Sequence, residues 1–389
     1  MELTKPSLLS LGIDASNLRA GGGVTHLVEF LRAAHPGEHG IKRIVVWTGR
    51  NTYARLPNFP WIERVHVPLL DRALPFRLYW QTIQLSKLAR RSCDVLFVPG
   101  GSYQGAFGPV VTMCRNLLPF EEYERQRYGM SCMRLKLRLL ELSQSSSFRH
   151  ADGLIFLTEY ARNTVLHRIG SLRCQQALIP HGIDERFRLP PRPQRSIGDY
   201  SLDKPFRFLY VSIVDVYKHQ WQVVEAVAQL KKEGLPVELE LVGPAYLPAM
   251  RLLRQAIANT DPEERYIHYR GSIPYSDLPK YYHRADAFVF ASSCENLPNT
   301  LLEAMAAGLP VACSNRGPMS EILGASGEYF DPEQPEQIAQ ALQSLMENPN
   351  RRRACAQVAF ERAQDYSWER CARDTLDLIV NIAESFSRK

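Results

Sequence analysis

The chain has 389 residues, of which 45% are hydrophobic and 23% are charged. This length predicts two domains with buried cores, and the composition excludes a disordered, collagen-like or fibrous protein. No stretch approaches the ~20 apolar residues of a membrane-spanning helix. The first residues turn polar too early for a secretory signal, so we expect a cytoplasmic protein.

Charge is spread unevenly along the chain, although the formal net charge is only +6. Residues 1–187 hold 24 Lys and Arg against 15 Asp and Glu, whereas residues 188–389 hold 23 against 26. A basic first half predicts an anionic partner for that half. No recognition motif supports nucleic acid, so anionic lipid headgroups at the inner face of the cell membrane are the better candidate.

The eight cysteines indicate neither a metal site nor a disulfide framework. None of them forms a CxxC pair, and their spacings match no zinc or disulfide pattern. We therefore expect scattered buried thiols and no bound metal.

The first half alternates short apolar runs with helical patterns. A glycine run, Gly21–Gly23, follows the first apolar run, and a helical pattern starts at Val24. Strands are predicted at 8–13, 41–47, 94–98, 110–113 and 154–157, and further helices at 77–91 and 159–167. This alternation predicts a parallel, doubly wound sheet, and hence a Rossmann-like domain over residues 1–187.

A linker and a second domain follow. Residues 188–205 contain four prolines and no apolar period, which predicts a linker. Strands are then predicted at 206–211, 237–242, 266–269, 287–291 and 311–313, and helices at 221–232, 247–259, 300–307, 335–347 and 350–364. A second Rossmann-like domain is therefore predicted at 206–365, followed by a helix within 366–389. Two such domains predict a cleft for two substrates.

The segment richest in reactive side chains begins at Cys294 and opens a predicted helix. Glu295 lies in the loop, and Glu303, eight residues later, lies one turn inside the helix. Two carboxylates beside a helix N-terminus suit a sugar nucleotide, because one can accept from sugar hydroxyls and the other from ribose hydroxyls. A surface acid plus a first-turn acid stabilised by the helix dipole explains the same spacing. The first-turn groups expected to face an anion are Asn299, as the N-cap, with Thr300 and Leu301.

This segment resembles the E-x7-E motif, followed by LLEAMAAGLPV, of retaining GT-B glycosyltransferases of family 4 (group 1). Other segments resemble that family in the same order along nearly the whole chain. They are the glycine-rich loop at 21–23, TEYAR at 158–162, IPHGID at 179–184, YKH at 217–219 and YSWE at 366–369. The resemblance implies a GT-B fold, with two Rossmann-like domains facing a cleft and a C-terminal helix that returns to the first domain.

The resemblance also implies roles for three charged residues. Glu295 would contact hydroxyls of the donor sugar, and Glu303 would contact the ribose. Lys218 would neutralise the diphosphate leaving group, a role that suits a compact cation with three donors. An ordinary surface lysine at a helix start is the alternative for Lys218.

Four further residues are implied in donor binding. Gly271 and Ile273 would line the nucleobase pocket after a strand, although a plain turn glycine is the alternative for Gly271. Gly22 and Gly23 would allow a phosphate or an acceptor to approach the backbone closely, with a flexible turn as the alternative.

The sequence departs from the family pattern at two places. The family commonly has an arginine five residues before the lysine, where this chain has Ile213. Arg115, Arg316 and Cys114 are candidates for diphosphate or acceptor contacts, and either arginine could replace the missing cation. A family histidine after a first-domain strand corresponds to Cys114 here, which puts a histidine contact to the donor sugar in doubt.

Residues 130–149 predict a basic amphipathic helix with charge from Arg134, Lys136 and Arg138. Such a helix lies on an anionic membrane, or else it packs in the domain with a solvated basic face.

Together these features predict a retaining hexosyltransferase without a cofactor or metal. Its donor would be a nucleoside diphosphate sugar, and its acceptor a lipid-linked or polysaccharide chain in cell-surface polysaccharide assembly, as for lipopolysaccharide. The alternatives are a sugar-nucleotide epimerase of the same fold and a non-catalytic sugar-nucleotide-binding protein. A phosphorylase would need a pyridoxal lysine site, which the sequence does not indicate.

Overall fold

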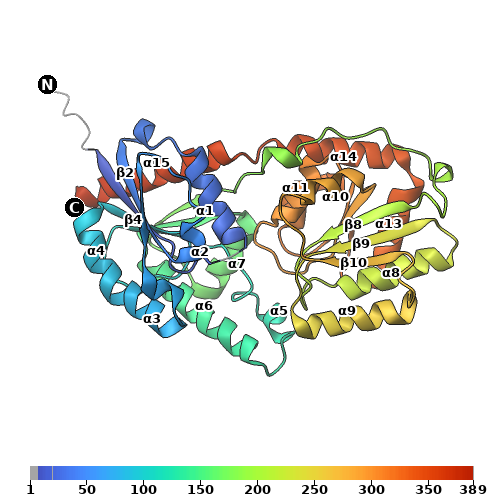
Figure 1. Ribbon diagram of the computed structural model, residues 1–389, viewed down its shortest axis with the longest axis horizontal. Coiled ribbons are helices and arrows are strands. Elements are labelled where there is room, and N and C mark those ends of the chain that lie inside the picture. Colours follow the sequence, from blue (N-terminus) through green and yellow to red (C-terminus); the bar gives the residue numbers. More distant parts are fainter. Residues whose placement is uncertain (1–7, 20, 389) are drawn as a thin grey trace. The chain divides into compact units, whose positions relative to one another are not determined.

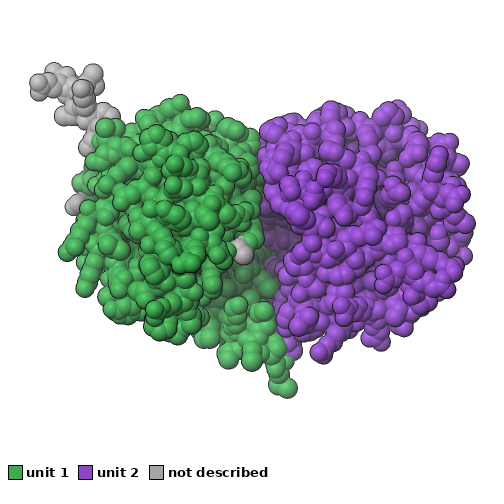
Figure 2. All heavy atoms as spheres, viewed as in Figure 1, with its two compact units in different colours: residues 1–120, 130–182, 367–389 green, residues 121–129, 183–366 purple. Residues whose placement is uncertain are grey.

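The computed structural model describes residues 8–19 and 21–388, which form two compact units (Figures 1 and 2). Unit 1 consists of the described residues up to Phe120, of Met130–Gly182, and of the described residues from Ser367 onward. Unit 2 consists of Glu121–Gly129 and Ile183–Tyr366. Both units are built from parallel strands and helices, as the sequence predicts.

Unit 1 contains a seven-stranded parallel sheet with the order β3-β2-β1-β4-β5-β6-β7. Its central strands β4, β5 and β6 are buried along their whole length, as expected when helices cover both faces of a parallel sheet. The strands are β1 (Leu9–Asp14), β2 (Ile41–Thr48), β3 (Ile62–His66), β4 (Val95–Val98), β5 (Val110–Met113), β6 (Gly153–Phe156) and β7 (Gln175–Leu178). The helices of this unit are α1 (Gly22–Ala33), α2 (Arg50–Tyr53), α3 (Leu74–Tyr79), α4 (Leu85–Ser92), α6 (Cys132–His150), α7 (Glu159–Ile169) and α15 (Trp368–Ser387).

Unit 2 contains a six-stranded parallel sheet with the order β10-β9-β8-β11-β12-β13. The strands are β8 (Phe206–Val211), β9 (Val237–Val242), β10 (Ile267–Gly271), β11 (Ala287–Phe290), β12 (Val311–Ser314) and β13 (Gly327–Phe330). The helices are α5 (Glu122–Gln126), α8 (Gln220–Lys232), α9 (Leu247–Thr260), α10 (Leu278–Arg284), α11 (Asn299–Ala306), α12 (Met319–Leu323), α13 (Pro335–Glu347) and α14 (Pro349–Ala363). The strand order reverses between β8 and β11, which is where ligands of doubly wound sheets bind.

The last helix returns to unit 1. Helix α15 packs against α1, and the ring of Trp368 lies 5.4 Å from that of His26. A Cβ atom on Gly182 would lie 2.2 Å from the amide nitrogen of Trp368, so only glycine fits beside the start of the helix. The predicted crossover helix is therefore present, and it is held in place by a close backbone contact.

The division of the structure into units differs from the predicted first domain, residues 1–187, at two segments. Glu121–Gly129, which includes α5, belongs to unit 2 although both of its chain neighbours belong to unit 1. Residues 183–187, predicted in the first domain, also belong to unit 2. Sequence periodicity does not reveal that such a segment belongs to the other unit, because its membership depends on contacts with residues far along the chain.

The proline-rich stretch 188–205 is not a free linker. Arg192 donates to the main-chain carbonyls of His283 and Ala285, and Arg352, which is fully buried, donates to the side chain of Gln194 and the carbonyl of Arg195. These contacts attach the stretch to unit 2. Among the described residues, no helix is both long and apolar enough to cross a bilayer.

Candidate functional site

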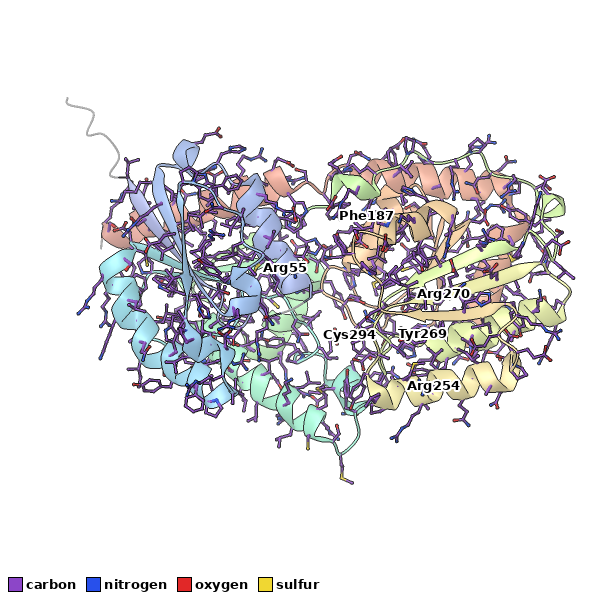
Figure 3. All side chains as sticks on the ribbon, in the orientation of Figure 1. Arg55, Phe187, Arg254, Tyr269, Arg270 and Cys294 are labelled. Carbon is purple, nitrogen blue, oxygen red and sulfur yellow. The ribbon has the colours of Figure 1, made fainter. Side chains whose placement is uncertain are left out.

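Two loops meet at the switch point of the unit 2 sheet. Strand β8 ends at Val211 and is followed by the loop that carries Lys218. Strand β11, its neighbour in the sheet, ends at Phe290 and is followed by the loop that carries Glu295. Figure 3 labels Cys294 in this second loop. Because parallel strands end at the same edge, the topology brings the two predicted catalytic residues together.

Lys218 and Glu295 form a mostly buried ion pair. The Nζ atom of Lys218 contacts Oε1 of Glu295, and the two side chains are only 7% and 14% exposed. The ammonium also lies 5.0 Å from the ring centre of Tyr217 and 5.3 Å from that of Phe290. The site thus holds a cation in a position sheltered from water, where electrostatic interactions are stronger than in solvent.

Glu303 is buried beneath two tyrosines. Tyr282 donates a hydrogen bond of 2.8 Å to Oε2 of Glu303, and Tyr275 donates one of 3.3 Å to Oε1. Burial raises the pKa of the Glu303 carboxyl from 4.5 to about 7, although both hydrogen bonds act in the opposite direction. This carboxyl therefore changes charge near neutral pH. The two tyrosines were not predicted, because nothing in their local sequence distinguishes them from core aromatics.

The start of α11 differs by one residue from the prediction. The N-cap is Pro298, not Asn299, and its carbonyl accepts from the amides of Leu301 and Leu302. Leu301 is therefore excluded as an anion-binding amide, and its side chain is fully buried. Asn299 and Thr300 are the first two residues of α11, so their amides have no carbonyl acceptor within the helix and point toward an anion-binding position.

The predicted nucleobase loop leads directly to Glu303. Gly271 ends β10 with a φ of 68°, a conformation that favours glycine. The residues just before it are Tyr269 and Arg270 (Figure 3). The following loop contains Ile273 and then Tyr275, whose hydroxyl donates to Glu303. The structure thus brings the loop of Gly271 and Ile273 to the carboxylate that was predicted to bind ribose.

Arg316 is already engaged by carboxylates. Its guanidinium donates to both carboxylate oxygens of Asp331, at 2.9 and 3.0 Å, and to Glu333 at 2.6 Å. Glu333 also accepts from Arg127 at 2.7 Å, and these hydrogen bonds lower the pKa of its carboxyl to about 2. Arg316 is therefore committed to an ion-pair network and is a poor replacement for the cation missing at Ile213.

Segment Glu121–Gly129 contacts both switch-point loops, which sequence reasoning missed. Ser293, two residues before Glu295, donates to Glu124 at 2.7 Å. Tyr128 donates to Asp215, three residues before Lys218, at 2.9 Å. The sequence analysis assigns no element to this segment, and only the tertiary structure reveals that it supports the loops.

In unit 1, Arg115 lies beside the glycines. The N-cap of α1 is Gly21, with a φ of 67°, so Gly22 and Gly23 belong to the first helical turn rather than to a loop. A Cβ atom on Gly23 would lie 2.9 Å from Nη1 of Arg115, and burial lowers the pKa of this guanidinium to about 10. The Nε atom of Arg115 is buried without a partner among the described residues. A helix N-terminus and a guanidinium therefore form an anion-binding arrangement.

Cys114 lies in the core of unit 1. It is fully buried in a cluster with Leu117, Phe120 and Phe148, and burial raises the pKa of its thiol to about 12. This burial argues against the expected ligand contact for Cys114, whereas the next residue, Arg115, reaches Gly23.

Each sheet, with its switch point, and the returning helix α15 define the GT-B fold. Over 98% of the chain, the structure matches sucrose-phosphate synthase from Thermosynechococcus elongatus with a TM-score of 0.75 and 18% identity, and the match covers all of that chain. Anabaena HepE in complex with UDP-glucose matches with a TM-score of 0.69 and 17% identity, again over 98% of this chain and 100% of the other. The predicted fold class is confirmed.

Residues 197–362 match the family model described as glycosyl transferases, group 1. The matched region contains Lys218, Glu295 and Glu303. The chain is also 28% identical over 257 residues to O-antigen chain mannosyltransferase B of Escherichia coli. That alignment covers 62% of this chain and 64% of the relative, so the chain spans less than two thirds of the relative's length.

Proposed function

We propose that the protein is a glycosyltransferase that moves a hexosyl group from a nucleoside diphosphate sugar to a lipid-linked or polysaccharide acceptor, with retention of configuration. The observation that carries this proposal is the Lys218–Glu295 pair at the switch point, within a region that matches the group 1 family. The E. coli relative is an O-antigen chain mannosyltransferase, which supports a role in cell-surface polysaccharide assembly. We propose a cytoplasmic protein with peripheral contact to the inner membrane face.

The diphosphate of the donor competes with Glu295 for Lys218. When the diphosphate binds, the ammonium turns toward it, and the amides of Asn299 and Thr300 add two donors to the same charge. Glu295 then loses its partner and accepts from hydroxyls of the donor sugar. The negative charge that develops as the glycosidic bond breaks is neutralised by groups already in place, so this chemistry requires no metal or cofactor.

In this proposal the nucleoside part of the donor binds at Glu303 and the loop beside it. Glu303 accepts from the ribose hydroxyls, while Tyr275 and Tyr282 hold it in position. The loop of Gly271 and Ile273 lies against the nucleobase. The structure of Anabaena HepE with UDP-glucose supports a nucleoside diphosphate sugar as the donor class.

Unit 1 receives the acceptor in this proposal. Its anion-binding arrangement, the first turn of α1 with Arg115, suits a phosphate of a lipid-linked or phosphorylated saccharide. No described side chain stands out as the nucleophile of a double displacement. We therefore favour attack from the face of the departing phosphate, with that phosphate accepting the proton of the acceptor hydroxyl.

A screen of UDP-, GDP-, ADP- and TDP-sugars by thermal shift tests the donor. A ligand at 100 times its dissociation constant adds roughly 2.7 kcal/mol of stability. With the donor found, Lys218→Ala is expected to lower the rate of transfer by about 100-fold or more, whereas Lys232→Ala, an exposed lysine of the same unit, leaves it unchanged. Equal rates in Lys218→Ala and wild type would contradict the site.

Incubation of the donor without acceptor separates the alternatives. An epimerase converts the sugar of the nucleotide, whereas a transferase leaves its configuration unchanged and hydrolyses it slowly at most. A non-catalytic protein binds the donor and turns over none of it with any acceptor. The anomeric configuration of the product, measured by NMR, tests retention.

A further inference from the structure

Helix α6 of unit 1 exposes a stripe of leucines, although several of its polar residues are buried together with Leu137 and Phe148. Leu135, Leu139 and Leu142 recur at the spacing of one helical stripe and are 63%, 58% and 62% exposed. The buried positions include Gln144 and Ser147, and Glu141, which is paired with Arg168 at 2.6 Å. A surface helix of a globular domain ordinarily has the opposite arrangement. The exposed leucines therefore form an apolar stripe of the kind that marks an interaction surface.

A second segment of unit 1, residues 72–92, also exposes large apolar side chains. Helices α3 and α4 are joined by a π-helical turn, Trp80–Gln84, and the whole segment is anchored by the buried side chains of Trp80 and Leu85. Its remaining large apolar residues are between 37% and 52% exposed. They are Leu74, Phe76, Leu78, Tyr79, Ile83 and Leu88.

Both segments combine this apolar surface with positive charge. Residues 72–93 contain five basic and no acidic residues. The exposed part of α6 adds Arg134, Lys136 and Arg138, and residues 130–140 contain no acid. Exposed apolar side chains interleaved with lysine and arginine are typical of segments that lie in the interface of an anionic bilayer.

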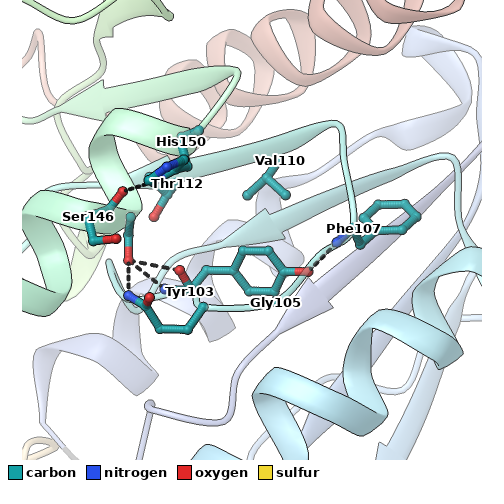
Figure 4. A pocket seen from close by; sticks show the side chains of 10 residues that line it. Tyr103, Gly105, Phe107, Val110, Thr112, Ser146 and His150 are labelled. Carbon is teal, nitrogen blue, oxygen red and sulfur yellow. Dashed lines mark hydrogen bonds between the residues drawn. The ribbon is translucent and has the colours of Figure 1, made fainter.

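One loop joins the two segments. Ser86 and Arg90 of α4 bond to the backbone of Ala106, at 2.9 and 2.8 Å. On the other side of the loop, the amide of Tyr103 donates to Ser147 of α6 at 2.8 Å. Figure 4 shows this loop beside the pocket at the end of α6, and Figure 1 shows α3 and α6 at the same edge of unit 1. The loop therefore links the two segments on the same side of unit 1.

We propose that this surface, formed by residues 72–92 and the exposed side of α6, docks unit 1 on an anionic lipid bilayer. Its leucines and aromatic rings enter the boundary between headgroups and acyl chains, and its basic residues contact the phosphates. A second copy of the chain is a poor occupant, because pairing this face with itself would oppose like charges. The proposal goes beyond attraction of a basic helix to headgroups, because the apolar insertion does not depend on salt. The docking surface depends on the proposed function in one respect: its role would be to give the protein access to a lipid-linked acceptor.

Flotation of the full-length protein with vesicles tests this surface. The vesicles are phosphatidylcholine with or without about one third phosphatidylglycerol, at low and high salt. The leucine variant is Leu135→Ser/Leu139→Ser/Leu142→Ser. Its matched control is Leu202→Ser/Leu247→Ser, two leucines of unit 2 that are 74% and 75% exposed. All changes are at exposed positions, and unchanged thermal unfolding checks that each variant is folded.

Wild type and control are expected to bind anionic vesicles and to keep part of that binding at high salt. The leucine variant should bind at least tenfold more weakly and lose the salt-resistant part. Changing Arg134, Lys136 and Arg138 to glutamate should weaken binding about fivefold or more per residue at low salt. No binding of wild type to anionic vesicles, an equal loss in the control, or a wild-type dimer that the leucine variant disrupts would overturn the proposal.

Transfer to a short soluble acceptor separates the two proposals. The leucine variant should retain this transfer, since none of its changes lies among the donor residues. If the wild-type protein does not bind vesicles but still transfers sugar, the docking surface and the proposed membrane contact are refuted, and the proposed transfer activity is not. Vesicle binding without any transfer would refute the proposed function alone.

Discussion

Glu303→Gln keeps the shape of a side chain that is 5% exposed and removes its ability to ionise. In the folded protein, burial raises the pKa of this carboxyl from 4.5 to about 7. At about 1.4 kcal/mol per pH unit, a rise of this size penalises the ionised folded protein by roughly 3 kcal/mol. The variant does not carry this penalty, so it should be more stable than wild type wherever Glu303 is ionised.

The sign follows from proton binding. Between pH 4.5 and about 7 the folded protein holds the Glu303 proton, whereas the unfolded chain has released it. The free energy of unfolding of wild type therefore falls as pH rises through this range. The difference between variant and wild type should be close to zero near pH 4.5 and should approach about 3 kcal/mol in favour of the variant near pH 8.

Differential scanning calorimetry of both proteins across this pH range measures the difference. Glu347→Gln, an exposed glutamate of the same unit, is the matched control and should show no such trend. A stability difference that does not change with pH would refute the reasoning, as would a Glu303→Gln protein that is less stable than wild type near pH 8. The donor affinity of wild type should increase as pH rises through about 7, because the ionised carboxylate accepts from the ribose hydroxyls. Glu303→Gln should bind the donor more weakly and show no such increase, because a neutral amide accepts fewer hydroxyl hydrogen bonds.

Three further predictions concern charges in unit 2. Lys218→Met leaves the mostly buried Glu295 without its cation and should destabilise the protein by about 3 kcal/mol, whereas Lys218→Met/Glu295→Met should recover most of that loss in calorimetry. Additive losses in this cycle would mean that the pair is not coupled. Ile213→Arg should be tolerated, since Ile213 is 38% exposed, and it should tighten UDP binding in titration calorimetry; a large loss of stability would instead show that Ile213 is a packing residue. Arg127→Met should lower the melting temperature at neutral pH. The difference in melting temperature between wild type and variant should shrink as pH falls from 4.5 toward 2, because Glu333 then loses its charge. A difference that stays constant with pH would show that the effect comes from packing.

The sequence predicts the central elements better than the edges. Strands 206–211 and 237–242 are predicted with their observed bounds, because the first is largely apolar and the second alternates apolar residues with glutamates before Gly243 and Pro244. Strand β7 escapes prediction, since its residues Gln175–Leu178 are half-exposed and mixed in polarity at the edge of the sheet. Edge strands carry little apolar signal, so their pairing is decided by the neighbouring strand.

Some residues of the candidate site could also be predicted from the sequence, and others could not. Lys218 and Glu295 could be predicted from motif and loop order, because the strand topology brings their loops to one sheet edge, and Glu303 follows from its place in the same motif. Tyr282 and Glu124 could not be predicted, since each reaches the site through a contact more than 20 residues away in the chain. Cys114 was assigned by its place in a motif, and motif position does not determine which of two neighbouring side chains points into the core.

Helix α15 completes unit 1, although it follows every other described element in the chain. During synthesis, Glu121–Gly129 and Ile183–Tyr366 have all emerged before Trp368 appears, so unit 2 has every one of its residues first. Until then, the surface of α1 that contacts α15 and the backbone beside Gly182 lack their partner. Because domains generally fold as units during synthesis, unit 1 can complete its fold only after every residue of unit 2 has been made, although the chain begins with unit 1.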